Sequence, residues 1–237
     1  MLTFGSLFAG IGGLDLGLER AGMRCVWQCE IDPYATKVLQ KHWPHVRRHD
    51  DARTFPPAGE WGVDLICGGD PCQENSVANQ SGRCRQPSLG GEFVRIVAAV
   101  RPAIVLRENP SVVRADAPWP WQRFRSELQH LGYSVLPFRL RACCFGAEHR
   151  RDRLFLLAVA TDSISFRREW WMARPGEKKS GGAYAEIEGH SWRAAEPRIC
   201  RVAHGVPARV DRLRGLGNAV VPQVAEWIGR RIMEALE

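Results

Sequence analysis

Short apolar runs alternate along this chain with segments in which apolar residues recur every three or four positions. The runs have the length and β-leaning composition of strands, and the periodic segments have the spacing of helices with one apolar face. Strands are predicted at residues 2–8, 24–29, 64–67, 103–107, 133–143 and 153–159, and helices at 14–21, 34–43, 92–100, 120–131 and 222–236. This alternation predicts an α/β fold, Rossmann-like, with a mixed, mostly parallel sheet and helices on both faces.

The alternation breaks down between residues 161 and 197. This stretch has little periodicity, a Gly-Gly pair and clustered Trp, Arg and Lys residues. A turn at GLGNAVVP and a closing amphipathic helix then follow. We therefore expect one main domain made of residues 1–160 and 198–237, interrupted by a small loop-rich insert at 161–197.

The composition is that of an ordinary globular domain, with 45% apolar and 25% charged residues in a chain of 237. No apolar run approaches the roughly 18 residues that a membrane span needs. The first residues also lack the basic lead and the cleavage site of a signal peptide. The sequence therefore predicts a cytoplasmic protein with no membrane contact.

The eight cysteines include no CxxC pair, which excludes a zinc ribbon and a secreted disulfide scaffold. The adjacent Cys143 and Cys144 are expected in a reduced, buried strand. Three histidines, His42, His45 and His49, have no second ligand cluster beside them. We predict no metal site.

The net charge of +7 is uneven along the chain. Residues 1–138 hold 15 basic and 14 acidic residues, whereas residues 139–237 hold 18 and 12. Only four of the 33 basic residues are lysine. The arginine bias suits phosphate and guanine recognition, and it equally suits a GC-rich coding genome, so charge alone does not decide the partner.

A glycine-rich loop follows the first predicted strand and contains Gly10, Gly12 and Gly13. Glycines let the backbone approach a ligand, and the start of the next helix offers free N–H groups. Glu30, at the end of the second strand, is placed to accept the two hydroxyls of a ribose, and Asp50 or Asp51 to accept an adenine amino group. Together these features favour a cofactor that carries a nucleoside.

Three further groups of polar residues stand where catalytic side chains of an α/β sheet are found. Cys72 comes shortly after a buried strand and is a candidate nucleophile. Glu108, after the next strand, is a candidate proton donor if burial raises its pKa. Arg151 and Arg153 alternate in an extended segment, so we expect their side chains to point together into the site.

The order FAGIGG, ExD, GGxPCQ, ENP, HRRDR and GNAVVP resembles the cytosine-5 DNA methyltransferase family. The resemblance covers nearly all of the chain except about residues 160–197, and it implies the fold of S-adenosylmethionine-dependent methyltransferases. It also implies that the cofactor, S-adenosylmethionine, is bound by Phe8, Gly10, Ile11, Gly13, Glu30, Ile31, Asp50, Asn218 and Ala219. If Asn218 reaches that cofactor, the closing helix must pack back beside the first strand.

The resemblance further implies that Cys72 attacks a cytosine flipped out of double-stranded DNA, with Glu108, Arg151 and Arg153 around the base. The insert at 161–197 would be a short target-recognition region, which favours a short or relaxed site. The chain would then be a compact, monomeric methylase, of the orphan kind that a phage or prophage carries or of a restriction-modification system. Two alternatives stay open: a tRNA cytosine-5 methyltransferase, and a DNA-binding relative with weak or no catalysis.

One departure from the family pattern lies next to the predicted nucleophile. Asp70 stands where the family usually has an apolar residue or proline. A carboxylate two residues from Cys72 disfavours the thiolate, unless an arginine neutralises it. The sequence therefore raises the question of what Asp70 contacts.

Overall fold

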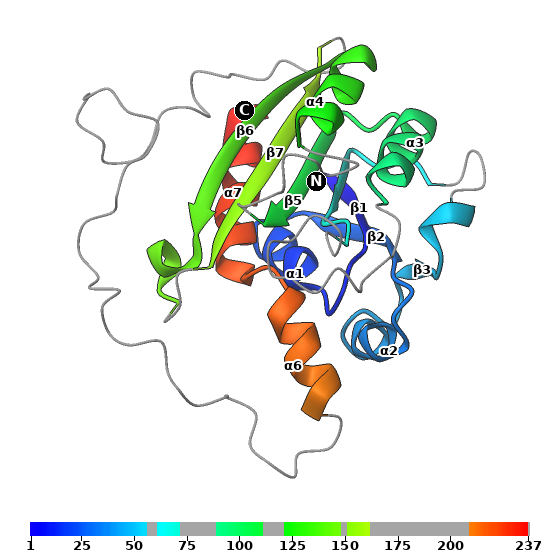
Figure 1. Ribbon diagram of the computed structural model, residues 1–237, viewed down its shortest axis with the longest axis vertical. Coiled ribbons are helices and arrows are strands. Elements are labelled where there is room, and N and C mark those ends of the chain that lie inside the picture. The colour runs from blue at the N-terminus through cyan, green and yellow to red at the C-terminus, as the bar shows by residue number, and fades with distance from the viewer. Residues whose placement is uncertain (56–60, 72–88, 111–120, 148–150, 162–208, 237) are drawn as a thin grey trace, which may run out of the picture.

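The computed structural model describes residues 1–55, 61–71, 89–110, 121–147, 151–161 and 209–236. Seven strands form one sheet in the order β3-β2-β1-β4-β5-β7-β6 (Figure 1). The strands are β1 Thr3–Leu7, β2 Arg24–Cys29, β3 Arg47–His49, β4 Leu65–Gly68, β5 Ile104–Pro110, β6 Tyr133–Arg141 and β7 Asp152–Ala160. The helices are α1 Gly13–Arg20, α2 Pro33–His42, α3 Gly90–Val100, α4 Trp121–His130, α6 Arg209–Asn218 and α7 Pro222–Leu236, with short 3-10 turns η1 Ala52–Thr54 and η2 Ala142–Phe145.

Five neighbouring strands, β1 to β5, run parallel, and β7 lies antiparallel between β5 and β6. Parallel strands need crossover connections, and α1, α2 and α3 lie in those connections. The predicted Rossmann-like, mostly parallel sheet is therefore confirmed. Its one antiparallel strand, β7, carries Arg153 towards the centre of the sheet.

The sheet is covered on both faces, as its alternating side chains require. In β4, Leu65 and Cys67 join a core cluster with residues of α1 and α7, whereas Ile66 joins the cluster of α3 and α4. Figure 1 shows α7 behind β6 and β7, with α4 on the near side. Each side chain on β4 or β5 thus faces one of two distinct environments.

Helix α7 packs directly on α1, although the two are far apart in the sequence (Figure 1). A Cβ atom at Gly17 would lie 2.4 Å from Ala225 Cβ, and one at Gly229 would lie 2.6 Å from Ala21 Cβ. The glycines therefore let the two helices approach closely. Phe4 of β1 and Ile228 of α7 share one core cluster, so the closing helix does return to the first strand.

Three local predictions were wrong. Strand β5 continues through Glu108, Asn109 and Pro110, because these residues pair with β7. Helix α6 covers 209–218, where a turn was expected from its glycines. Cys143 and Cys144 are half-buried, free thiols in the 3-10 turn η2 rather than in a buried strand.

The predicted insert at 161–197 lies outside the described residues apart from its first position. Within the part of the chain that the structure describes, no helix is long and apolar enough to cross a membrane.

Candidate active site

Several predicted site residues follow or end strands β1, β2 and β5, around the point where strand order reverses, between β1 and β4. The chain leaves β1 towards β2 on one side, whereas β4 is followed by β5 on the other. Leu7 is in register with Gly68, so the glycine loop after β1 lies beside Gly69 and Asp70 after β4. A crevice at the carboxyl ends of the strands forms at such a switch point, and it is the usual ligand site of an open α/β sheet.

The glycine loop has the backbone that its sequence predicts. Gly10 and Gly12 have φ values of +56° and +84°, and Phe8 also has a positive φ of +53°. A Cβ atom at Gly10 would meet nothing within 4 Å, whereas one at Gly13 would lie 2.3 Å from the Val220 carbonyl oxygen. Gly10 therefore faces open space, while Gly13 lets the segment before α7 pass close to the loop.

Glu30 ties the glycine loop to the end of β2. Its carboxylate accepts the Gly10 N–H at 2.7 Å and the Asp32 N–H at 2.8 Å. The neighbouring Ile31 is 61% exposed, unusual for a large apolar side chain. A carboxylate and an uncovered apolar side chain therefore lie next to each other beside the loop.

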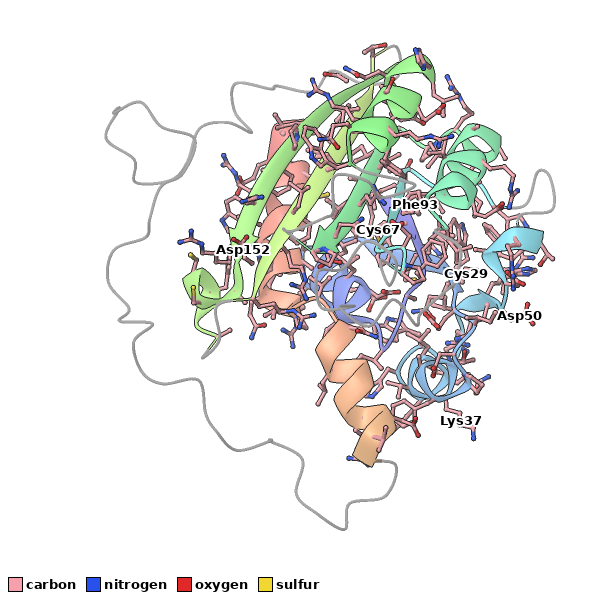
Figure 2. All side chains as sticks on the ribbon, in the orientation of Figure 1. Cys29, Lys37, Asp50, Cys67, Phe93 and Asp152 are labelled. Carbon is pink, nitrogen blue, oxygen red and sulfur yellow. The ribbon has the colours of Figure 1, made fainter. Side chains whose placement is uncertain are left out.

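The structure distinguishes the two acidic residues that follow β3. Asp51 forms an ion pair of 2.8 Å with Arg53, and Arg53 holds the pKa of Asp51 below its usual range. The side chain of Asp50 is 88% exposed, and Figure 2 shows it at the outer edge of the molecule. Asp50 therefore has the more accessible carboxylate.

Asn218 and Ala219 lie at the end of α6, near the glycine loop. A Cβ atom at Gly215 of the same helix would be 3.0 Å from Ile11 Cγ2. Arg151 donates hydrogen bonds to the carbonyl oxygens of Gly217, at 2.8 Å, and of Ala219. The segment 217–219 is thus held between the loop after β1 and the start of β7.

Glu108 is a buried carboxyl group on β5, on the α1–α7 face of the sheet. Arg153 Nε forms an ion pair with its Oε1 at 2.7 Å. Burial raises the pKa of Glu108, although Arg153 and Arg151 oppose that rise. A Cβ atom at Gly69 would be 2.9 Å from Glu108 Oε2, so the acid lies against a residue three positions before Cys72.

The two arginines do not reach the same partners. Arg153 contacts Glu108, whereas Arg151 has a φ of +30° and turns its guanidinium to the backbone of 217–219. Burial lowers the pKa of Arg151 to about 10, so it stays charged at neutral pH. We expected both side chains to point together into the site. Both arginines do lower the pKa of Glu108, but their guanidinium groups bind different partners.

The sequence analysis missed the partner of Asp70. Arg107 Nε and Nη2 donate to the two carboxylate oxygens of Asp70 at 2.6 and 2.9 Å, and both side chains are buried. A basic residue inside the apolar run AIVLR was the available signal, because a buried charge requires a partner. Cys72 itself lies outside the described residues.

A second buried polar group lies beneath the glycine loop. Asp15 accepts hydrogen bonds from Gln28 Nε2 at 2.8 Å and from Ser6 Oγ at 3.0 Å. Burial raises its pKa to about 6. No local sequence pattern predicts that this carboxyl group is buried, because Asp15 occupies an ordinary first-turn position of α1.

Metal ligands do not cluster in the described ranges: no group of three or more His, Cys, Asp or Glu side chains could hold an ion there. His49 instead contacts Thr54 Oγ1 at 2.8 Å.

The strand order β3-β2-β1-β4-β5-β7-β6, with helices on both faces, is that of a Rossmann-like α/β methyltransferase fold. A model of the C-5 cytosine-specific DNA methylases matches residues 2–190. The chain belongs to this C-5 cytosine-specific DNA methylase family.

Similar curated proteins include two bacterial type II methyltransferases. M.Eco47II of Escherichia coli is 34% identical over 163 residues, which are 66% of this chain and 39% of that protein. M2.BsuMI of Bacillus subtilis is 36% identical over 165 residues, 65% of this chain and 41% of that protein. The chain thus spans about two fifths of the length of these relatives.

Solved structures agree with the fold. A candidate DNA modification methyltransferase encoded within an E. coli prophage has a TM-score of 0.58 at 25% identity, covering 73% of this chain and 51% of that one. A methyltransferase of Entamoeba histolytica has a TM-score of 0.65 at 12% identity, covering 100% of this chain and 99% of that one. The second likeness bears on the fold alone.

Proposed function

We propose that this protein transfers a methyl group from S-adenosylmethionine to carbon 5 of cytosine in double-stranded DNA, with Cys72 as the nucleophile. The observation that carries the proposal is the buried Glu108, paired with Arg153 and lying against Gly69 at the start of the loop to Cys72. Membership of the C-5 cytosine-specific DNA methylase family supports the reaction class.

The residues beside the glycine loop fit the cofactor. When bound, S-adenosylmethionine supplies an activated methyl group on its sulfonium. A carboxylate has about four acceptor sites, so one that accepts backbone N–H groups, as Glu30 does, is also chemically suited to accept ribose hydroxyls. Exposed Ile31 would cover the adenine, Asp50 would accept its amino group, and Asn218 and Ala219 would lie at the methionine end.

Carbon 5 of cytosine is a poor nucleophile and must first be activated. In the proposed reaction, the thiolate of Cys72 forms a bond to carbon 6, and Glu108 gives a proton to ring nitrogen 3. The addition breaks the carbon 5–carbon 6 double bond, and its electron pair becomes available at carbon 5 to form a bond to the methyl carbon. The bond from the methyl group to sulfur would break with its electron pair staying on sulfur, so that S-adenosylhomocysteine leaves. A buried acid with a raised pKa suits this step, because it holds its proton at a higher pH than an exposed glutamate does.

Elimination completes the reaction. The proton on carbon 5 leaves to a base, the double bond re-forms, the bond from carbon 6 to sulfur breaks, and the proton on nitrogen 3 returns to Glu108. Arg153 would donate to the carbonyl oxygen of the base, while Arg151 would hold segment 217–219 against the cofactor. A stacked base cannot reach these groups, so the target cytosine has to be flipped out of the duplex.

Covalent trapping tests the proposal. Duplex DNA containing 5-fluorocytosine blocks the final elimination, so an active enzyme with S-adenosylmethionine should give a protein–DNA adduct on a denaturing gel. The adduct should disappear in Cys72→Ala and persist in Cys144→Ala, a matched control at a free, half-buried thiol. Absence of an adduct with the wild-type protein, or its persistence in Cys72→Ala, would refute the proposed mechanism.

The two alternative functions give different outcomes in the same system. A tRNA methyltransferase would methylate tRNA in preference to duplex DNA when both compete for tritiated cofactor. A non-catalytic relative would bind DNA without forming an adduct. Bisulfite sequencing of plasmid from an expressing host would report the target context, and a single methylated site of six base pairs or more would contradict the predicted relaxed specificity. The monomeric state stays a prediction.

A further inference from the structure

The ion pair between Asp70 and Arg107 is almost completely removed from solvent, with side-chain exposures of 0% and 2%. Two parallel hydrogen bonds, of 2.6 and 2.9 Å, join the guanidinium to the carboxylate. Such a fork-to-fork contact fixes both distance and orientation, which a single charge–charge contact does not. The burial of both charges makes the pair costly to break, because either partner alone would be left uncompensated.

The pair lies on the opposite face of β5 from Glu108. Arg107 and Asn109 flank Glu108 in the strand, and both donate to the Asp70 carboxylate, Asn109 Nδ2 at 3.3 Å. The Arg107 guanidinium also lies 4.0 Å from the ring centre of Phe124, which comes from α4. Asp70 is therefore bound by the two residues on either side of the proposed acid, and Arg107 in turn packs on a helix.

The register between β4 and β5 places Asp70 close to Arg107 and Glu108. Gly68 of β4 pairs with Arg107 of β5, so Asp70 lies just beyond the last paired residue of β4. Asp70 precedes Cys72 by two positions, and a chain extends by at most about 3.6 Å per residue. Anchoring Asp70 to β5 therefore limits where the nucleophile can lie relative to Glu108.

We propose that Asp70 and Arg107 are positioning residues for the proposed methyl transfer, because they hold the backbone that leads to Cys72 against β5, beside Glu108. The inference rests on the proposed function. In family members that have a proline at the position of Asp70, the proline ring restricts the backbone there. In this chain the ion pair of Asp70 with Arg107 restrains the backbone at that position instead. Because the two charges cancel, the pair adds no net charge two residues before Cys72.

The test compares three variants with the wild type in the 5-fluorocytosine trapping reaction and in steady-state methyl transfer. Asp70→Asn keeps the shape of the side chain but leaves the Arg107 charge unpaired. The double variant, Asp70→Asn with Arg107→Met, removes both charges, and it keeps the test informative if the single variant does not fold. Glu226→Gln is the control, since it breaks an exposed ion pair of 2.8 Å with Arg230 on α7.

We expect kcat to fall by about 10²-fold in both Asp70 variants, as for a misplacement of roughly 1 Å. Binding of S-adenosylhomocysteine should stay within about twofold of wild type in every variant, because the Asp70 carboxylate is bound by Arg107 and Asn109 of β5 and not by the glycine loop or Glu30. The control should leave kcat unchanged. Folded Asp70 variants that keep kcat within about twofold of wild type would overturn the inference.

The pH profile separates positioning from a general loss of structure. Arginine keeps its charge, so the unpaired Arg107 in Asp70→Asn should stabilise the Cys72 thiolate and move the midpoint of the trapping rate to lower pH. The double variant should return the midpoint to the wild-type value while its kcat stays low. Unchanged midpoints throughout would refute the predicted nearness of the pair to Cys72. A wild-type protein that forms no adduct would instead refute the proposed function itself.

Discussion

Arg153 reaches diagonally from β7 to β5, placing its Nε 2.7 Å from Glu108 Oε1. Glu108 is paired in the sheet with Phe155, and Arg153 lies two positions before Phe155 in β7, on the same face. Burial raises the pKa of Glu108 while this arginine lowers it, and burial is the stronger effect. The contact thus orients the carboxyl group without forcing it to stay ionised.

Replacing Glu108 by glutamine should remove the proton donor while keeping the size of the side chain. We expect kcat to fall by roughly 10²- to 10⁴-fold, the usual contribution of general acid catalysis. The affinity for S-adenosylhomocysteine should not change, because Glu30 and the glycine loop lie elsewhere in the crevice. Glu92→Gln, which breaks an ion pair of 2.7 Å with Arg95 on α3, is the control. Methyl transfer by Glu108→Gln at the wild-type rate would contradict the assigned role.

The two arginines should have separable effects. Arg151→Ala removes the donors to the Gly217 and Ala219 carbonyls, so it should weaken cofactor binding by about tenfold or more. Arg153→Ala should leave cofactor affinity nearly intact but slow adduct formation, because it removes the partner of Glu108. Calorimetry with S-adenosylhomocysteine and trapping on fluorinated DNA measure the two effects. Equal losses in both assays for both variants would argue against this division.

Glu30→Ala should weaken cofactor binding strongly. The carboxylate organises the loop through the Gly10 and Asp32 N–H groups and is the proposed ribose acceptor. Hydrogen bonds to a charged group contribute about 1.5–3 kcal/mol each, so the Kd should rise at least tenfold. Affinity for DNA should be unaffected, which a salt titration of DNA binding would check. A Kd for the cofactor that does not change would remove Glu30 from the site.

Gly13→Ala should test the close passage of the C-terminal segment over the loop. The new Cβ would lie 2.3 Å from the Val220 carbonyl oxygen, so this segment must move. We expect a loss of about 1–3 kcal/mol in the free energy of unfolding, as for other overpacked sites, together with weaker cofactor binding. Gly62→Ala is the control, since its Cβ would meet nothing within 4 Å. Equal stability of both variants in urea would contradict the described packing.

Asp15 should make stability depend on pH. Its pKa is raised to about 6 in the folded protein, from an ordinary value of 3.8, because it is buried. The folded state therefore binds the proton more tightly, so the contribution of Asp15 is fully present below about pH 4 and is lost as the pH rises through about 6. The loss is on the order of 3 kcal/mol. Asp15→Asn should flatten the pH dependence of urea unfolding between pH 4.5 and 7.5, and parallel curves for the two proteins would contradict the prediction.

The predicted sheet and glycine loop follow from signals that are local in the sequence. Alternating apolar runs predict the strands, and Gly10, Gly12 and Glu30 stand at fixed short intervals. The contact of Asp70 with Arg107 joins residues 37 positions apart, and it depends on a strand register that no local pattern encodes. The hydrogen bonds of Arg151 to Gly217 and Ala219 span 66 and 68 positions, so no local sequence pattern could predict them either.

The wrong predictions have the same origin. Gly215 and Gly217 indicated a turn, because glycine costs about 1 kcal/mol in a helix. Contacts with Ile11 and with Arg151 from distant parts of the chain support α6. Similarly, Pro110 indicated that β5 had ended, yet β7 continues to pair as far as Arg153.

The packing of α7 on α1 has a consequence for how the chain is made. About 200 residues separate the end of α1 from the start of α7. At roughly 5–20 residues per second, a ribosome needs on the order of 10–40 s to make that interval. During this time Leu14 and Leu18 lack the apolar surface that covers them in the finished protein. The apolar face of α1 therefore stays uncovered in the nascent chain until synthesis has reached Val224, Ala225 and Ile228 of α7.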